Sequence, residues 1–414
     1  MLRYGFAPVP PNTTVEVGPV VIAVKARRIL DGTGRSPIEH GVVLVDGPRI
    51  KAVGPQTHVP IPDGAEVIDC GAHTVLPGLV DAHSHASIIP GLGDQIGQLK
   101  QPPAPQVLRA VANLRTDLRS GVTTMRVVGE EHFIDIDLRA AIEEGRIPGP
   151  RLRVATRPIT ARNGHGAALT FSDGEDEIRR HIRENIAMGA DLIKLFMTGG
   201  VSSKGTASRW YAYSRHEVDV AVEEAHRNNR PVAVHAHGGP GVRICIDAGV
   251  DTIEHGKLCD RDDLVEMRKR GIWLVTNNAV SGHPDGIEKG DAHVPAIMAK
   301  LLESREKSRE NFAAVLDSGV KWALGTDSMH GLMWWEIAKV VEWGASPPDA
   351  LLAATRRAAE AMGMGDEVGS LEPGKLADVI SVDGDPLADV ACLKRARVIL
   401  QGGHRPHDPL RDDL

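Results

Sequence analysis

Residues 75–85 read VLPGLVDAHSH, an apolar run that ends in two histidines, His83 and His85. Side chains alternate between the two faces of a β-strand, so histidines two residues apart at a strand end point the same way. Two imidazoles on one face are suitable ligands for a single metal ion. Histidine pairs also occur on ordinary exposed strands, and the interpretation therefore depends on the rest of the chain.

The run 75–85 is the first of eight apolar segments that alternate with helical patterns up to about residue 365. The others are VTTMRVV, RLRVAT, DLIKLFM, PVAVHA, DTIEH, IWLVT and KWALGTD. One intervening stretch, RHEVDVAVEEAHRNN, has apolar residues at helical spacing and stops before Pro231. Eight strand–helix repeats predict an α/β fold, a (β/α)8 TIM-like barrel whose active site lies at the C-terminal ends of the strands.

Short β-like runs broken by glycine, proline and aspartate flank this region on both sides. The N-terminal flank contains VVIAVKARRIL, GVVLVDGPRIKAVG and AEVIDC, which favour an antiparallel unit, and the C-terminal flank contains ADVISVDGDP and ARVILQGG. We expect residues 18–76 and 367–414 to form one composite β domain, a small discontinuous β-sandwich. The barrel, residues 77–366, would be inserted between them.

The composition is that of an ordinary soluble protein. Of the 414 residues, 42% are hydrophobic and 25% are charged, and the formal net charge is -7. This charge gives no basic surface for nucleic acid or for an anionic membrane, and no apolar run is long enough to span a bilayer. The four cysteines have no CxxC spacing, which favours reduced thiols. We therefore expect a cytoplasmic protein with neither a membrane nor a nucleic-acid partner.

Side chains that bind metals recur at the ends of five of the eight predicted strands. They are His83 and His85 on the first, Lys194 on the fourth, His235 on the fifth, His255 on the sixth and Asp327 on the eighth. Imidazole and carboxylate groups are common ligands of divalent ions. Because the C-terminal strand ends meet in the mouth of a barrel, the set predicts a site for a pair of divalent ions there.

Lys194 is the exception in this set. An ammonium group would be repelled by metal ions and is costly to bury, so Lys194 fits if its neutral amine has reacted with carbon dioxide to form a carbamate that bridges both ions. Taken singly, His255 is also interpretable as a buried histidine, Lys194 as a surface lysine and Asp327 as a helix cap. The recurrence at five strand ends favours the metal site.

Several segments resemble the amidohydrolase superfamily, over nearly the whole chain from about residue 20. They are VLPGLVDAHSH, KLFMTGGVSSKG, RPVAVHAHG, AGVDTIEHG, ALGTDS and GSLEPGKLADVISVDGDPL. KLFMTGGVSSKG followed by VAVHAHG resembles the imidazolonepropionase-like branch, which includes microbial metal-dependent carboxypeptidases, prolidase-like dipeptidases and ochratoxin-hydrolysing amidases.

The resemblance implies a binuclear site, usually of zinc, with N6-carboxylated Lys194 as the bridge between the two ions. His83, His85 and Asp327 would hold one ion. His235 and His255 would hold the other. Relatives often form larger homo-oligomers, so the resemblance also favours a homo-oligomer.

These features predict a metal-dependent hydrolase that acts on a carbon–nitrogen amide bond. A metal-bridging hydroxide would attack the carbonyl, and Asp327 would act as general base and then deliver the proton to the departing amine. The expected substrate is a small molecule, a dipeptide or an N-acyl amino acid, as for a carboxypeptidase, dipeptidase or ochratoxin amidase. Substrate contacts are expected from His165, Tyr211, Tyr213, Arg215, His237 and His330.

Other functions stay open from the residues alone. A lactonase, a carbamate hydrolase or a phosphoester hydrolase would use the same pair of metal ions. A mononuclear deaminase typically shows a glutamate soon after the histidine of the fifth strand, where this chain has HAHGGP. A catalytically inactive scaffold would typically lack some of the ligands, whereas all are present here.

Overall fold

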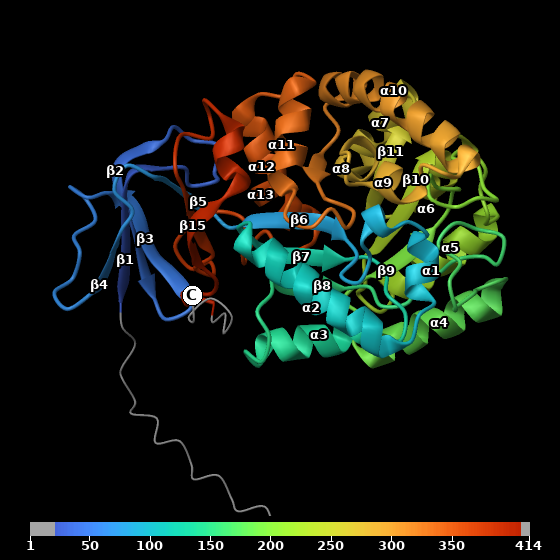
Figure 1. Cartoon of the computed structure of the whole chain (residues 1–414), viewed down its shortest axis with the longest axis horizontal. Helices are drawn as coiled ribbons and strands as arrows, with labels where there is room; N and C mark the ends of the chain where they lie inside the picture. Colours follow the sequence, from blue (N-terminus) through green and yellow to red (C-terminus); the bar gives the residue numbers. More distant parts are fainter. Residues whose placement is uncertain (1–20, 407–414) are drawn as a thin grey trace, which may run out of the picture.

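The structure, a computed structural model, describes residues 21–406 and has two unequal parts (Figure 1). The smaller part is rich in strands and combines the blue N-terminal and red C-terminal segments. The larger part contains parallel strands surrounded by helices. The outer ends of the predicted composite β domain, residues 18–20 and 407–414, lie outside the described residues.

The smaller part contains one mixed sheet built from both ends of the chain. Its seven strands are β1 (Ile22–Ile29), β2 (Ile38–Asp46), β3 (Arg49–Pro55), β4 (Glu66–Asp69), β5 (Thr74–Pro77), β14 (Val379–Val382) and β15 (Ala396–Leu400). Their order is β15-β14-β5-β1-β2-β3, and β4 also pairs with β1. β1, β2 and β3 pair antiparallel, as expected, whereas β1 pairs in parallel with β4 and β5, so the sheet is mixed. Because β14 pairs with β5, the C-terminal strands belong to the same hydrogen-bonded sheet as the N-terminal strands.

The run 75–85 forms parts of two strands. β5 ends at Pro77 in the mixed sheet, and β6 (Leu79–Ser84) begins the larger part. Gly78 lies between them, where an added Cβ would be 2.1 Å from Oγ1 of Thr123. Only glycine allows the backbone to pass this close to the neighbouring strand. The first strand of the larger part therefore starts at Leu79.

The larger part contains eight parallel strands in two sheets. The first sheet contains β6, β7 (Val122–Val127) and β8 (Arg151–Val154). The second contains β9 (Ile193–Phe196), β10 (Val232–Gly238), β11 (Thr252–Leu258), β12 (Trp273–Thr276) and β13 (Trp322–Leu324). The predicted α/β class and the parallel pairing of consecutive strands are confirmed.

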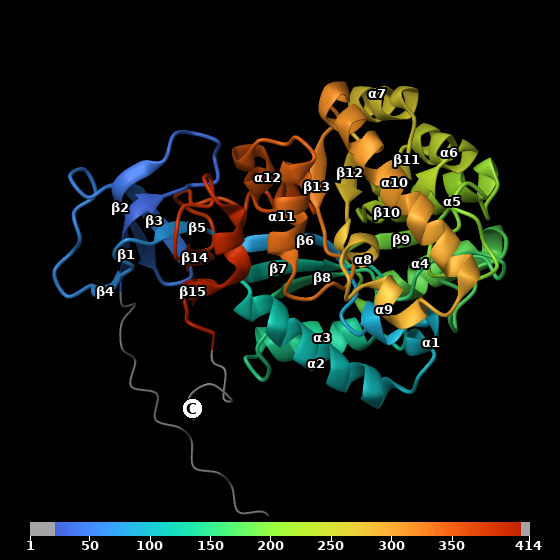
Figure 2. The ribbon, with the colours of Figure 1, turned by 45° about the horizontal axis from the view of Figure 1, so that its top comes forward.

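Main-chain hydrogen bonds link the two sheets at both edges. At one edge Ile159, which follows β8, forms a parallel bridge with Leu195 of β9. At the other edge the N–H of Asp327, which follows β13, donates to the carbonyl oxygen of His83 in β6 at 2.8 Å. Figure 2 shows the two sets of strands side by side within the same ring of helices. The C-terminal strand ends of both sheets therefore face a common region.

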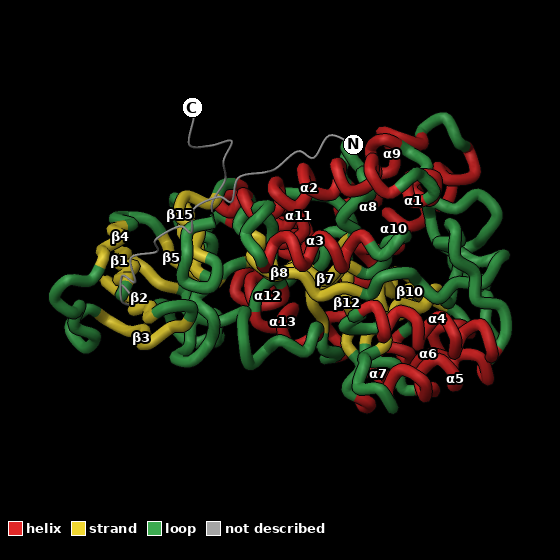
Figure 3. Tube along the Cα trace, turned by 90° about the horizontal axis from the view of Figure 1, so that it is seen from below, coloured by secondary structure: helices red, strands yellow, loops and turns green. Residues whose placement is uncertain are grey.

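Helices follow most of the parallel strands and cover their outer side, as Figure 3 shows in red around the yellow strands. The helices between β6 and β11 are α1 (Gln95–Leu99), α2 (Pro103–Arg119), α3 (Ile134–Glu143), α4 (Glu175–Met188), α5 (Arg215–His226) and α6 (Pro240–Ala248), with the 3-10 helix η1 (Pro90–Leu92). Later in the chain come α7 (Arg261–Arg270), α8 (Ala279–Gly282), α9 (Ile287–Asp291), α10 (Pro295–Ser318), α11 (Met333–Glu342), α12 (Pro347–Ala353), α13 (Arg356–Ala361) and η2 (Val390–Lys394). Within residues 21–406 no helix is both long and apolar enough to cross a membrane.

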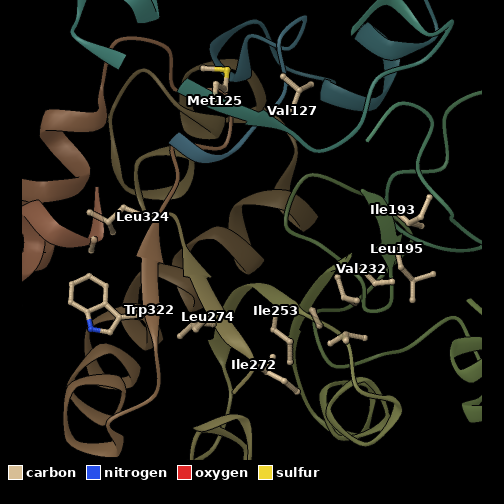
Figure 4. Packing of buried hydrophobic residues seen from close by; sticks show 14 of the residues in the cluster. Met125, Val127, Ile193, Leu195, Val232, Ile253, Ile272, Leu274, Trp322 and Leu324 are labelled. Atoms are coloured by element: carbon tan, nitrogen blue, oxygen red, sulfur yellow. The ribbon is translucent and has the colours of Figure 1, made fainter. Parts of the chain in front are cut away.

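The main hydrophobic core lies between the parallel strands and these helices (Figure 4). Ile193 and Leu195 of β9 belong to this core, as do Val234 and Ala236 of β10. Because strand side chains alternate, the residues between them point to the opposite face. This alternation directs Lys194, and the histidines of β10, toward the inside of the strand assembly.

Candidate metal centre

A pocket at the C-terminal ends of the parallel strands contains the six side chains that the sequence predicts as metal ligands. They are His83 of β6, His85 just after it, Lys194 of β9, His235 of β10, His255 of β11 and Asp327 after β13. Both parallel sheets contribute to the set. Apolar side chains also line the pocket.

His83, His85 and Asp327 form a compact group whose potential ligand atoms all lie within 4.8 Å of one another. Nε2 of His83 is 3.4 Å from Oδ1 of Asp327, and Nε2 of His85 is 3.7 Å from the same atom. Asp327 has a φ of 51°, a left-handed conformation that is uncommon outside glycine and that clusters at functional sites. The three groups are arranged as a site for one metal ion.

His235 and His255 lie beside this group. Their ring centroids are 4.3 Å apart, and the ring of His255 is 4.9 Å from that of His83. Nδ1 of His255 lies 2.7 Å from Oδ1 of Asn277. If that amide oxygen is the acceptor, the imidazole proton is on Nδ1 and Nε2 is the ligand atom. The two ring distances show that His255 is close both to the compact group and to His235.

Three of the six predicted ligands have a buried polar atom without a hydrogen-bond partner: Nε2 of His83, Nε2 of His235 and Nζ of Lys194. Leaving a buried polar atom unsatisfied costs about 1–3 kcal/mol. The two imidazole nitrogens fit a divalent ion, and imidazole suits zinc among other metals. An ammonium group does not fit such an ion directly, whereas a carboxylated lysine does.

Burial keeps the imidazoles neutral, which is the form that binds a metal. It lowers the pKa of His85 to about 4. It also lowers the pKa values of His235 and His255 well below the usual range, and the nearby histidines add to this effect. Burial lowers the pKa of Lys194 to about 8, so a neutral amine is more accessible there than on the surface.

A buried carboxylate that the sequence analysis did not single out holds His83 in place. Oε2 of Glu254 accepts from Nδ1 of His83 at 2.6 Å, and Oε1 accepts from the guanidinium of Arg126 at 2.7 Å. Burial alone would raise the pKa of Glu254, but the charge of Arg126 and the hydrogen bond with His83 lower it to about 2. The bond at Nδ1 leaves Nε2 of His83 directed into the pocket.

Two of the predicted substrate contacts, His165 and His237, line the pocket. The ring of His165 is 4.4 Å from that of His235, and its Nδ1 is hydrogen-bonded to the hydroxyl of Ser203. Burial lowers the pKa of His165 to about 3. His237 is also buried, and its ring centroid is 4.8 Å from that of His235.

The other four predicted substrate contacts do not line this pocket. Tyr213 is buried in the core, where its hydroxyl donates to the carbonyl of Ser172, and Tyr211 is half exposed. Arg215 begins α5 and pairs with carboxylates on the outer surface. His330 is buried between the carboxylate of Asp117 and the carbonyl of Ile88.

Lys257 is a lining residue that the sequence analysis missed. It belongs to β11, two residues after His255, and only 4% of it is exposed. Its Nζ donates to the hydroxyl of Ser281 at 2.6 Å, and burial lowers its pKa to about 8. The spacing of two in IEHGK is the signal that could have identified it.

The model of the amidohydrolase family matches residues 74–402. The chain belongs to the amidohydrolase family. Among its relatives, ochratoxinase from Aspergillus niger is 27% identical, with 96% of this chain and 90% of the relative covered. The resemblance seen in the sequence is thereby confirmed, as is the prediction of a hydrolase that acts on carbon–nitrogen amide bonds.

Two solved structures are similar to this amidohydrolase over almost their whole length. One is a Xaa-Pro dipeptidase with bound methionine in the active site, 29% identical, with a TM-score of 0.84 and coverage of 92% of this chain and 98% of the other. The second is a prolidase complexed with N-methylphosphonate-L-proline, 28% identical, with a TM-score of 0.84 and coverage of 93% and 99%.

Proposed function

We propose that this amidohydrolase uses two divalent metal ions to cleave an amide bond in a dipeptide or an N-acyl amino acid with a free carboxylate. The observation that carries the proposal is the gathering of six ligand-type side chains in one pocket, three of them with a buried atom that has no partner. The names of the relatives support the substrate class, since they include an ochratoxinase, a Xaa-Pro dipeptidase and a prolidase.

In this proposal His83, His85 and Asp327 hold one ion. His235 and His255 would hold the other, and N6-carboxylated Lys194 would contribute a ligand to both. Carboxylation would turn a buried amine that has no hydrogen-bond partner into an anion that can bind a cation. When bound, two divalent cations lower the pKa of a shared water molecule and polarise the scissile carbonyl.

Asp327 is the general base in this proposal. Its Oδ1 faces His83 and His85, while its Oδ2 is 4.0 Å from Nδ1 of His255, so the carboxylate lies close to three of the other proposed ligands. Its side chain is 16% exposed, which leaves it open to the pocket. It accepts a proton from the attacking water and delivers that proton to the nitrogen of the departing amine.

The rest of the pocket suits a substrate with an apolar side chain. Apolar residues from β9, from loops and from short helices form the apolar wall of the pocket, which we define as Ile88, Ile96, Leu99, Phe196, Val201, Val280 and Ile287. A concave apolar surface with a few directed polar groups is typical of a small-molecule site. This wall would also exclude water from the reacting amide.

The test measures metal content and hydrolysis on the same preparation. Zinc-loaded protein is assayed with dipeptides, N-acyl amino acids, lactones, carbamates and aryl phosphoesters. Asp327→Asn is the catalytic variant, and Asp317→Asn, on the exposed side of α10, is the matched control. We expect two ions per chain and release of amino acids that only Asp327→Asn abolishes.

Each contrary outcome identifies the part of the proposal that fails. Turnover of lactones, carbamates or phosphoesters without turnover of amides would show that the substrate class is wrong. Amide hydrolysis by a protein that holds one ion per chain would contradict the binuclear arrangement. Amide hydrolysis that survives in Asp327→Asn would remove the role of that carboxylate as general base.

A further inference from the structure

Lys257 is a buried cation in the same pocket that the proposed reaction does not use. It lines the pocket from β11 and lies on the side formed by α8, where Ser281 accepts its hydrogen bond at 2.6 Å. Within residues 21–406 no carboxylate forms an ion pair with it. An ammonium group has three N–H donors, and only one of them has a partner in the protein.

The nearest acidic groups are committed elsewhere. Asp327 and Glu336 act on the amino group of Lys257 through space, and Arg305 repels it. Asp327 belongs to the proposed metal site, and Oε1 of Glu336 accepts the N–H groups of Asn278 and Ala279. A buried charge is costly unless it is paired. Lys257 therefore needs an anion that the protein itself does not supply.

A second donor without a partner lines the same pocket. Nε2 of Gln95, in α1, is buried and has no hydrogen-bond partner. Like the amino group of Lys257, an amide NH2 can only donate. Donors from both residues thus line one pocket, and a carboxylate can accept from such donors.

Several residues of the apolar wall lie on the same short helices as Gln95 and Ser281, in the pocket that also contains the candidate metal centre. Ile96 and Leu99 belong to α1, as does Gln95, while Val280 and Ile287 belong to α8 and α9 beside Ser281. The pocket thus combines a group of metal ligands, an apolar wall and a cationic corner. An N-acyl amino acid offers a matching group for each: an amide carbonyl for the metal centre, a side chain for the apolar wall and a carboxylate for the cation.

We propose that Lys257, assisted by Gln95, binds the carboxylate of the substrate and selects N-acylated amino acids over neutral amides of the same shape. This inference rests on the proposed function and makes it more specific, because it names the residue that recognises the free carboxylate. Lys257 is a specificity-determining residue in this scheme and takes no part in proton transfer.

The test compares two ligands that differ only in the group at the carboxyl end. N-acetyl-L-phenylalanine carries the carboxylate, and N-acetyl-L-phenylalaninol has a hydroxymethyl group in its place. We expect Lys257→Met to raise KM for the acid about 10- to 100-fold, as the loss of a charge-assisted hydrogen bond does, while kcat for the acid and both constants for the alcohol change little. Lys257→Arg should retain part of the preference.

Measurements of metal content and of direct binding distinguish a failure of this inference from a failure of the proposed function. Lys269→Met, which removes an exposed lysine on α7, is the matched control. If Lys257→Met impairs hydrolysis of the acid and of the alcohol equally, with or without loss of metal, the inference is overturned. A wild-type protein that hydrolyses both ligands equally well would also overturn it, although amide hydrolysis itself would stand.

If the protein hydrolyses neither ligand, calorimetric titration with the same two ligands still measures their binding. Tighter binding of the acid that disappears in Lys257→Met would support the carboxylate site while the proposed reaction fails. Binding of the acid that is equal in wild type and Lys257→Met would overturn the carboxylate site, whatever the enzyme assay shows.

Discussion

Nδ1 of His83 lies 2.6 Å from Oε2 of Glu254, and neither side chain is more than 1% exposed. The other oxygen of Glu254 accepts from Arg126, so a buried chain of three charged or polar groups ends at a proposed metal ligand. A carboxylate bonded to the far nitrogen of a histidine fixes the tautomer and the orientation of the ring. The carboxylate therefore acts on the metal site through His83.

We expect Glu254→Gln to weaken metal binding roughly 10- to 100-fold, because the neutral amide orients His83 less firmly and makes it a weaker base. Competition with a chelating indicator measures the affinity. Glu310→Gln, on the exposed face of α10, should leave it unchanged. Equal affinities of wild type and Glu254→Gln would contradict the role assigned to this carboxylate.

Arg126 compensates the buried charge of Glu254, and its own side chain is 4% exposed. Arg126→Met should lower the free energy of unfolding by about 3–5 kcal/mol, because it leaves an unpaired carboxylate in the interior. Urea denaturation of the metal-free protein measures this loss. Arg126→Met combined with Glu254→Leu should recover a large part of it, since both charges are then absent. A double variant less stable than Arg126→Met would contradict the pairing.

Nζ of Lys194 is buried without a hydrogen-bond partner, and this unsatisfied amine underlies the proposed carboxylation. We expect metal uptake by the metal-free protein to increase with added bicarbonate, and native mass spectrometry to show the mass of one carbon dioxide on the metal-loaded chain. Lys194→Met should lose both effects, whereas Lys269→Met should keep them. Full uptake of two ions by Lys194→Met would show that no bridge from this residue is needed.

Glu336 gives the fold a dependence on pH that is separate from the metal ligands. Burial raises the pKa of its carboxyl group from 4.5 to about 8. Between these values the folded protein binds more protons than the unfolded chain, so the contribution of this group to stability is lost as the pH rises toward 8. Glu336→Gln stays neutral and can still accept the N–H groups of Asn278 and Ala279.

We therefore expect wild type to lose stability relative to Glu336→Gln between pH 4.5 and pH 8. The difference in the free energy of unfolding should change by about 1 kcal/mol or more over this interval. Denaturation curves at several pH values measure it. Glu310→Gln is the control for removal of an exposed carboxyl group, and parallel pH profiles of wild type and Glu336→Gln would refute the prediction.

Much of the arrangement around the candidate site could be predicted because strand alternation is a short-range property. The core position of Ile193 and Leu195 directs Lys194 inward, as the sequence pattern indicates. The eight strands were predictable for the same reason. The division of the run 75–85 was not, because it depends on the contact of Gly78 with Thr123, a residue far along the chain.

Regular alternation fails at His255. Ile253 of the same strand belongs to the outer core, and two residues later a regular strand would face the same way. The φ of 72° at His255 breaks the strand geometry, and both His255 and Lys257 line the pocket. The spacing of two between His255 and Lys257 was overlooked because regular alternation from Ile253 would place both residues on the outer face. Tyr213 was assigned to the pocket by sequence proximity alone, although its hydroxyl bonds to Ser172 in the core.

Gly325 allows the two proposed ligands at the junction of the sheets to approach each other. A Cβ added at this glycine would lie 2.6 Å from both the backbone nitrogen and the Cβ of His83. The hydrogen bond from the N–H of Asp327 to the carbonyl of His83 lies two residues further along. Backbone atoms cannot move aside as the end of a long side chain can, so any added methyl group must separate β13 from β6.

We expect Gly325→Ala to lower the free energy of unfolding by about 1–3 kcal/mol, the usual effect of overpacking, and to weaken metal binding because Asp327 moves away from His83 and His85. Gly205→Ala is the matched control, since a Cβ there meets no atom within 4 Å. Thermal denaturation and indicator competition on the same samples measure both effects. A stable Gly325→Ala that binds metal as wild type does would show that the approach of β13 to β6 does not position these ligands.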